Sequence, residues 1–356
     1  MASVKVMVKT ILGKVARNVD ISEGLIDTHR IFLDEEQYDL WNTDCILKSV
    51  LTLTNSNCFA IYESRGVYFL LVSELDSITS DKFEECDDNN VFSLDFIKSS
   101  GLQRSVHINK EYLLENVFIG NGVDLQNVQP ENVFECFPEI RTYRFKEAVD
   151  LDDEKRSYDL KVIAYYALCQ SKSTLVLPFE EATITDFIDI ANGSNDNYPI
   201  DYLIRSLTSN SWKTSFLDIY RCIERLYPLA FLDAYRRRLS SSLSPTQTRD
   251  ILKDIQRGRF ESYEDANIKH LIELLPPDII SLMDGIVNGE TLYQWVYKRR
   301  NESVHFQREK KPVDGLSDAD WNIFIQFLLK AILFLYNDLD EYLIALPDFD
   351  VKNYSL

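Results

Sequence analysis

The chain has few of the residues that build metal centres, and those it has are scattered. Among its 356 residues there are four histidines and six cysteines, with no CxxC pair and no histidine at ligand spacing from a cysteine. This pattern argues against a zinc site and for a reducing compartment. We therefore expect neither a bound metal nor another cofactor.

Phosphate loops and long apolar runs are also missing. The stretch Gly120-Asn121-Gly122 has no third glycine and no following Lys-Ser/Thr pair, so we expect a turn there and not a phosphate-binding loop. The longest apolar stretch, 327–336, is short and contains Lys330, and the chain does not open with a charged segment followed by an apolar one. These absences predict a cytoplasmic protein with no membrane segment.

Positive charge is scarce as well. The net charge is −19, which is unfavourable for long-range attraction to nucleic acid. The deficit is uneven, because residues 205–311 hold eighteen Lys and Arg against fourteen Asp and Glu, a surplus of four positive charges, while the rest of the chain carries −23. A mildly basic segment with acidic flanks can still hold a few phosphates.

Length and patterning predict an α+β protein with two domains, since 356 residues are many for a single core. Residues 1–150 show the period-two alternation and turn signals of strands, which predicts a β-rich sensor or regulatory domain. The expected strands are 3–8, 58–62, 67–72, 91–96, 104–108, 116–119 and 141–146, with 63–66 as a hairpin turn. We expect the acidic run 84–88 to be a solvated loop.

After a second acidic run, 150–154, helical spacing replaces the alternation. It predicts a helical connector at 151–200, an all-α bundle at 201–346 and a tail at 347–356. The expected helices are 158–169, 183–191, 210–227, 244–256, 263–275 and a last one that Ser317 and Asp320 cap reciprocally. The apolar stripe of that last helix is wide enough for part of it to pack against a second copy.

The stretch 298–306 concentrates the chemistry of the chain. It places Arg300, Asn301 and His305 where an aromatic helix meets a charged loop. A guanidinium forks onto phosphate oxygens, and an imidazole exchanges protons near neutral pH. In metal-free RNA cleavage, His305 would act as acid or base while Arg300 holds the charge that grows on the phosphorane. The plain alternative is an exposed basic helix end with a surface histidine.

Two points about this stretch stay open at this level. Glu224 either pairs with Arg300 or forms an ordinary intrahelical pair with a neighbouring arginine. Arg300 and His305 lie about 140° apart around an ideal helix, so either the helix frays at Ser303 or the site is composite.

The sequence Arg300-Asn301-x-x-x-His305 resembles the R-N-x(3–5)-H signature of the HEPN superfamily, small all-α bundles found in RNA-cutting toxins and antiviral proteins. The helix expected at 210–227 resembles the first HEPN helix, and 317–342 resembles the closing one. The resemblance covers about residues 200–345, and it is strongest to helical domains fused to a β-rich sensor in anti-phage proteins of the ApeA kind.

This resemblance implies a metal-independent endoribonuclease toxin of the abortive-infection type, acting on RNA as a homodimer whose two motifs face each other across a cleft. It implies Arg300 as phosphate clamp, His305 as acid or base, Asn301 as orienting donor and Glu224 as support, with a cellular or phage-derived trigger at the N-terminal domain. An inactive HEPN-like scaffold that recognises a protein or a nucleotide is the alternative, and the acidic charge favours it.

Overall fold

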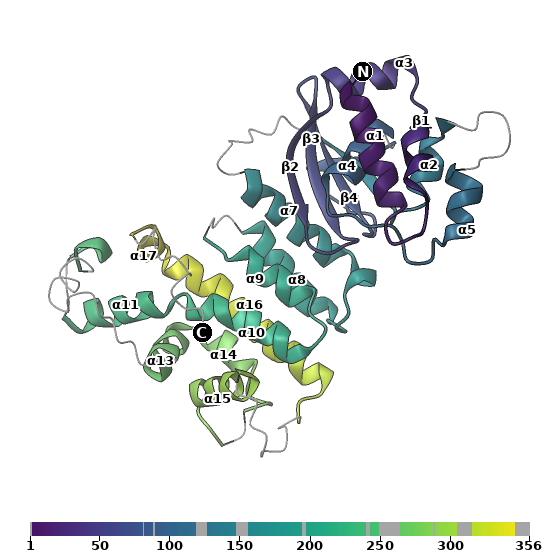
Figure 1. The fold of residues 1–356 in the computed structure, drawn as a ribbon. Helices are drawn as coiled ribbons and strands as arrows, with labels where there is room; N and C mark the ends of the chain where they lie inside the picture. The colour runs from purple at the N-terminus through teal and green to yellow at the C-terminus, as the bar shows by residue number, and fades with distance from the viewer. Residues whose placement is uncertain are drawn as a thin grey trace. The chain divides into compact units, whose positions relative to one another are not determined.

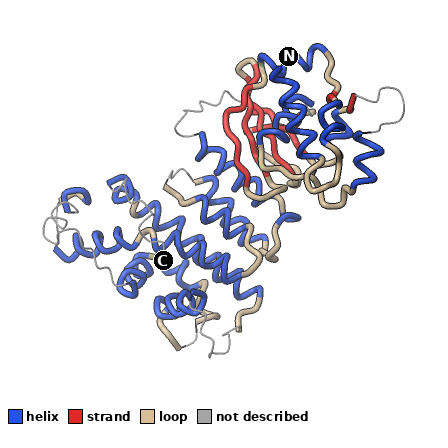
Figure 2. The backbone as a smooth tube through the Cα atoms, viewed as in Figure 1, coloured by secondary structure: helices blue, strands red, loops and turns tan. Residues whose placement is uncertain are grey.

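The computed structural model describes residues 2–80, 82–87, 90–118, 127–146, 156–193, 197–239, 243–248, 264–287, 289–304 and 315–345 (Figures 1 and 2). They form two compact units that divide between Thr174 and Leu175. The first unit contains an antiparallel sheet with helices and the second is helical, so the expected α+β class is confirmed.

The first unit alternates short helices with strands along the chain. Its elements are α1 (Ala2–Val15), α2 (Glu23–Thr28), β1 (Arg30–Ile31), α3 (Glu35–Thr43), β2 (Ile46–Thr52), β3 (Cys58–Ser64), β4 (Val67–Ser73), β5 (Phe83–Cys86), α4 (Asn90–Ser99), α5 (Lys110–Leu113), a π-helical turn (Leu114–Phe118), β6 (Asn127–Val128), α6 (Pro130–Phe134), β7 (Ile140–Phe145), α7 (Arg156–Gln170) and a 3-10 turn (Lys172–Thr174).

An antiparallel sheet in the order β2-β3-β4-β7-β5 forms the centre of this unit. The expected hairpin joins β3 to β4, with Ser64 paired to Val67. Its two turn residues, Arg65 and Gly66, both have positive φ, 50° and 77°. That is the geometry of a type I′ turn, whose twist matches that of the strands it connects. The strand expected at 141–146 is also present, as β7.

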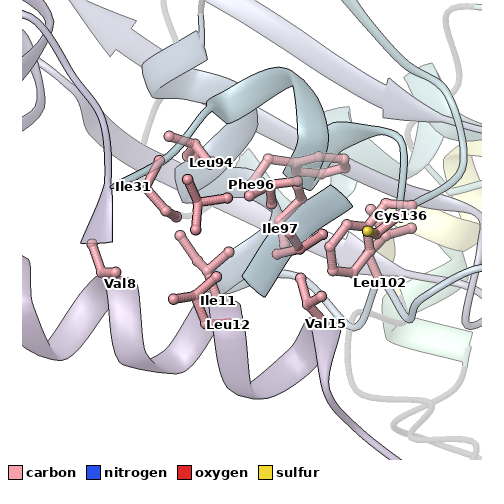
Figure 3. Close-up of a cluster of buried hydrophobic side chains, with 14 of the residues drawn as sticks. Val8, Ile11, Leu12, Val15, Ile31, Leu94, Phe96, Ile97, Leu102 and Cys136 are labelled. Atoms are coloured by element: carbon pink, nitrogen blue, oxygen red, sulfur yellow. The ribbon is translucent and has the colours of Figure 1, made fainter. Parts of the chain in front are cut away.

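Helices cover both faces of the sheet. Cys58, Ala60 and Tyr62 of β3 belong to a buried cluster with α1 and α4, and Phe59 and Ile61 point the other way, where α7 packs on β2 and β3. Figure 3 shows the aliphatic stripe of α1 against α4; the stripe consists of Val8, Ile11, Leu12 and Val15.

Two of the expected strands are helices in the structure. Residues 3–8 lie in α1, because the buried stripe continues at helical spacing to Val15, beyond the short window that alternates. Residues 91–96 lie in α4, which is buried on all sides. Phe92, Leu94 and Phe96 alternate with Ser93 and Asp95 as in a half-buried strand, but α4 buries both sets of side chains.

Three further expectations for the first unit are wrong. Residues 104–108 form no strand, and 116–118 belong to the π-helical turn. The acidic run expected as a loop begins inside β5, where Glu84 and Glu85 are exposed on an edge strand. Edge strands tolerate charged side chains because one side faces solvent.

The helical unit contains α8 (Glu181–Asn192), α9 (Ile200–Leu207), α10 (Trp212–Glu224), α11 (Tyr227–Leu239), α13 (Glu264–Leu274), α14 (Pro277–Ser281), α15 (Leu292–Val304), α16 (Asp318–Asp338) and α17 (Asp340–Ala345). Pro228 follows the first residue of α11, so it separates two helices as its missing N–H predicts. The expected reciprocal cap of Ser317 and Asp320 starts α16.

The unit boundary differs from the expected one at residue 150. The helix expected at 158–169 is present as α7 and belongs to the first unit, whereas the helix expected at 183–191 is α8 and belongs to the second. The segment 151–200 is therefore shared between the units. The turn 120–122, the acidic run 150–154 and the tail 347–356 lie outside the described residues.

α16 is the helix of the described chain that is long and apolar enough to cross a membrane by length and composition. In the structure, 61% of its most apolar window is buried inside the protein. Its buried side chains include Phe324, Phe327, Leu328, Ile332 and Leu335, as expected, while Ile323 is only half-buried. This burial is that of the central core helix of a bundle.

Candidate functional site

Two helices position the candidate site. α10 begins at Ser211, whose hydroxyl accepts a hydrogen bond from the Thr214 N–H, and its apolar side packs on α9, α15 and α16. α15 is anchored by Trp295, whose ring lies edge-on to Phe324 of α16 at 4.8 Å. This packing places the C-terminal turns of α15 beside the end of α10.

Arg300 is held by the contact that the sequence left open. Its Nε and Nη2 both donate to Glu224 Oε1, at 3.1 Å each, and its Nη1 donates to Asn301 Oδ1 at 3.1 Å. Only 14% of the Arg300 side chain and 30% of the Glu224 side chain are exposed. A guanidinium held at all three nitrogens and largely buried has a fixed orientation.

The two basic residues before Arg300 are also paired with acids. Lys298 Nζ lies 2.7 Å from Glu290 Oε1, and Arg299 Nη1 lies 3.3 Å from Glu302 Oε2. The Arg299 guanidinium stacks over the Trp295 ring, 4.9 Å from its centroid. Glutamate side chains thus neutralise the basic run, and a phosphate that binds there must displace these carboxylates.

The helix does not fray at Ser303. α15 continues to Val304, and Ser303 Oγ donates to the Arg299 carbonyl at 2.8 Å, a bond typical of a helix interior. Of the two alternatives left open by the sequence, fraying at Ser303 is therefore not observed in the described part of α15. His305 lies outside the described residues.

Glu224 lies beside a buried pair of tyrosines. Tyr220 and Tyr227 stand before and after it on the chain, and their hydroxyls are 2.5 Å apart. Of the two intrahelical alternatives for Glu224, Arg221 donates to Asp218 Oδ1 at 2.7 Å and Arg225 donates to the Asn197 carbonyl at 3.3 Å. The long-range pair of Glu224 with Arg300 therefore exists beside local pairing of the neighbouring arginine.

A second polar cluster in this unit had no signal in the sequence. Asp233 accepts hydrogen bonds from Tyr342 at 2.9 Å and Arg237 at 2.7 Å, and its Oδ2 lies 3.0 Å from Nε2 of His270. Burial acts to raise the pKa of the Asp233 carboxyl, but these donors together outweigh it and lower that pKa to about 2. Burial, and after it the hydrogen bond to the Asp233 carboxylate, raises the pKa of Tyr342 to about 12. Through its contact with Asp233, His270 bridges α13 to α11.

The described residues hold no group of three or more His, Cys, Asp and Glu side chains that could bind a metal ion. The cysteines of the first unit and α10 are free thiols, most of them buried. Burial raises the pKa of Cys136 to about 12 and raises that of Cys222 further, so these two thiols are poor nucleophiles.

Comparison of the chain with protein-family models, with curated proteins and with solved structures finds no match.

Proposed function

We propose that the chain is a metal-independent endoribonuclease, a cytoplasmic toxin of antiviral abortive infection. The observation that carries the proposal is the fixed Arg300 guanidinium, which Glu224 and Asn301 hold and which precedes His305 by five residues in the sequence. A preorganised guanidinium stabilises charge that develops on a phosphorane, because its orientation needs no rearrangement during the reaction.

In the proposed reaction the ribose 2′-hydroxyl attacks the adjacent phosphorus. His305 removes the 2′-proton or protonates the leaving 5′-oxygen, and Arg300 holds the non-bridging oxygens. The products are a 2′,3′-cyclic phosphate and a 5′-hydroxyl, and the reaction needs no metal. Asn301 and Glu224 act as positioning residues, since both contact the Arg300 guanidinium.

The complete enzyme in this proposal is a homodimer through the helical unit, with the two motifs contributing to one cleft. The first unit then senses a trigger, phage-derived or cellular, or restrains the nuclease. This division of labour is supported by the two compact units and by the location of the motif within the second.

The test uses the full-length protein and total RNA in the presence of EDTA. His305→Ala and Arg300→Ala should each lower cleavage about 10²–10⁴-fold, the usual contribution of one acid–base group or one preorganised donor. Both variants should also lose toxicity in cells. His107→Ala, which changes an exposed histidine of the first unit, should keep full activity. Unchanged cleavage by either site variant contradicts the proposal.

A second candidate function is a catalytically inactive scaffold that recognises a protein or a nucleotide. The acid-paired basic run favours it, because each of Lys298, Arg299 and Arg300 already has a carboxylate partner. RNA fragments with cyclic-phosphate ends support the nuclease. If the protein yields no such fragments and the Arg300→Ala variant is still toxic in cells, the result supports the scaffold.

A further inference from the structure

The exposed side of α9 and α10 carries a group of basic and aromatic side chains that the proposed catalytic set does not use. Arg205 and Arg221 both stack on the Tyr202 ring, with their Cζ atoms 5.6 Å and 5.7 Å from its centroid. Both arginines are exposed, and Tyr202 is half-buried between them. We name these three residues the α9–α10 cluster.

The charges of this cluster are arranged differently from those of the run 298–300. Its acidic partner is Asp218, which accepts from Arg221 at 2.7 Å and is 95% buried, with 5% exposed. The Asp218 carboxylate therefore lies beneath the surface, while the two guanidinia face solvent together with Asp201, the exposed carboxylate four residues before Arg205 on α9. The run 298–300 instead has its carboxylates half-exposed beside the cations.

A tyrosine that carries two guanidinia reduces their freedom before any ligand binds. Stacked arginine keeps its N–H groups available in the ring plane, so it can still fork onto phosphate oxygens. The entropy lost on binding is smaller for a side chain already restrained. Two restrained cations side by side form a local surface that fits the phosphates of a polyanion at short range.

The cluster is continuous with the candidate site. Arg221 precedes Glu224 by three residues on α10, and residues so spaced have Cβ atoms about 5–6 Å apart on one helix surface. Glu224 in turn contacts Arg300 of α15. Cations from α15, α10 and α9 therefore follow one another across neighbouring helices, and α9 packs directly on α10 (Figure 1).

We infer that the α9–α10 cluster is a backbone-binding subsite for single-stranded RNA, in which Arg205 and Arg221 hold phosphates of the strand whose scissile linkage lies at Arg300. The identity of the occupant rests on the proposed function. The subsite binds through charge and shape, so it adds affinity without choosing a base sequence.

The experiment measures binding of a 2′-O-methyl RNA 12-mer, which has no nucleophilic 2′-hydroxyl, to the full-length protein by fluorescence anisotropy between 50 and 200 mM salt. The variants are Arg205→Gln, Arg221→Gln and the double change. Each phosphate contact contributes about 0.7 to the slope of log K against log salt for a single strand, so the double variant should lose about 1.4 of slope. At 0.1 M salt this equals about 25-fold weaker binding.

The matched control is Arg65→Gln. Arg65 is an exposed arginine of the first unit that ion-pairs with Asp44 at 2.7 Å, as Arg221 does with Asp218. The control removes the same charge and should leave affinity within about twofold. Tyr202→Phe should bind as wild type, while Tyr202→Ala should weaken binding, because the ring and not the hydroxyl holds the arginines.

An unchanged salt slope in folded Arg205→Gln and Arg221→Gln proteins overturns the subsite, and so does an altered self-association in sedimentation with unaltered RNA affinity. If Arg221→Gln unfolds the protein because the buried Asp218 loses its partner, the binding measurement on Arg205→Gln alone still tests the subsite. Cleavage assays separate the two proposals. If the wild type cuts RNA and the arginine variants keep full RNA affinity, only the subsite is refuted. If the wild type does not cut RNA but the arginine variants bind it more weakly, only the nuclease is refuted.

Discussion

The ion pair between Glu224 and Arg300 should be measurable as a coupling energy in a double-mutant cycle. The cycle consists of Glu224→Gln, Arg300→Gln and the double variant, which keep polarity and approximate size. Two charge-assisted N–H···O bonds join these side chains, each worth about 1.5–3 kcal/mol when fully buried. Both end on one oxygen, and 30% of the Glu224 side chain is exposed, so screening reduces the coupling to about 2 kcal/mol.

The measurement is urea unfolding followed by tryptophan fluorescence. Three of the four tryptophans, Trp212, Trp295 and Trp321, belong to the helical unit, and a Trp41→Phe background removes the signal of the first unit. In thermal unfolding followed by the same fluorescence, each single variant should lower the midpoint temperature by about 4–8 °C, given about 2–4 °C per kcal/mol for units of this size.

A control cycle on the same helix uses Arg299→Gln and Glu302→Gln. This i,i+3 pair spans 3.3 Å within α15, and its coupling should be about 0.3 kcal/mol. A coupling below about 0.5 kcal/mol for Glu224 and Arg300, no larger than the control, would refute the view that a fixed guanidinium is built into the bundle.

Three further predictions concern the polar contacts of the fold. Asp233→Asn should destabilise the helical unit by about 2 kcal/mol at pH 7. Because the pKa of Asp233 is depressed, this stability difference should persist down to about pH 4 and vanish as the pH falls through 2. A stability difference that grows on acidification contradicts this prediction. Asn322→Ala should lower the free energy of unfolding in urea by about 3–4 kcal/mol. The Asn322 amide is 1% exposed, accepts from Glu180 N and Thr183 Oγ1, and donates to two carbonyls. A loss under about 1 kcal/mol would show that water replaces the amide. Gly66→Ala should cost about 1 kcal/mol because φ is +77° there, with Gly24→Ala as the control at a glycine without that constraint, and equal melting temperatures would reject the turn argument.

The hairpin and the long helices were predictable because their signals are local. Arg65-Gly66 between two alternating runs specifies a tight turn, and Ser317 with Asp320 specifies a helix start within four residues. The strands expected at 3–8 and 91–96 were wrong because a period-two alternation over six residues does not exclude a helix, and the longer helices α1 and α4 contain the two windows.

Some contacts of the candidate site could likewise be predicted from the sequence and others could not. The pair of Glu224 with Arg300 could be anticipated from a carboxylate on the side of a helix and a motif arginine elsewhere, although 76 residues separate them. The bonds of Asp233 with His270 and Tyr342 could not, since their separations of 37 and 109 residues follow from how helices pack and leave no spacing in the sequence. Two arginines on one tyrosine ring are equally invisible before α9 and α10 are packed together.

The N-terminal helix acquires α4, one of the elements on which its aliphatic stripe packs, late during synthesis. Lys14 Nζ donates to the carbonyls of Ile97 and Ser100, both at 2.6 Å, 83 and 86 residues further along the chain. At about 5–20 residues per second, α1 therefore waits about 4–17 s on the ribosome with its aliphatic stripe exposed. Nascent chains stalled before residue 100 should consequently be strong clients for chaperones that bind apolar segments, and those stalled well beyond it should be released.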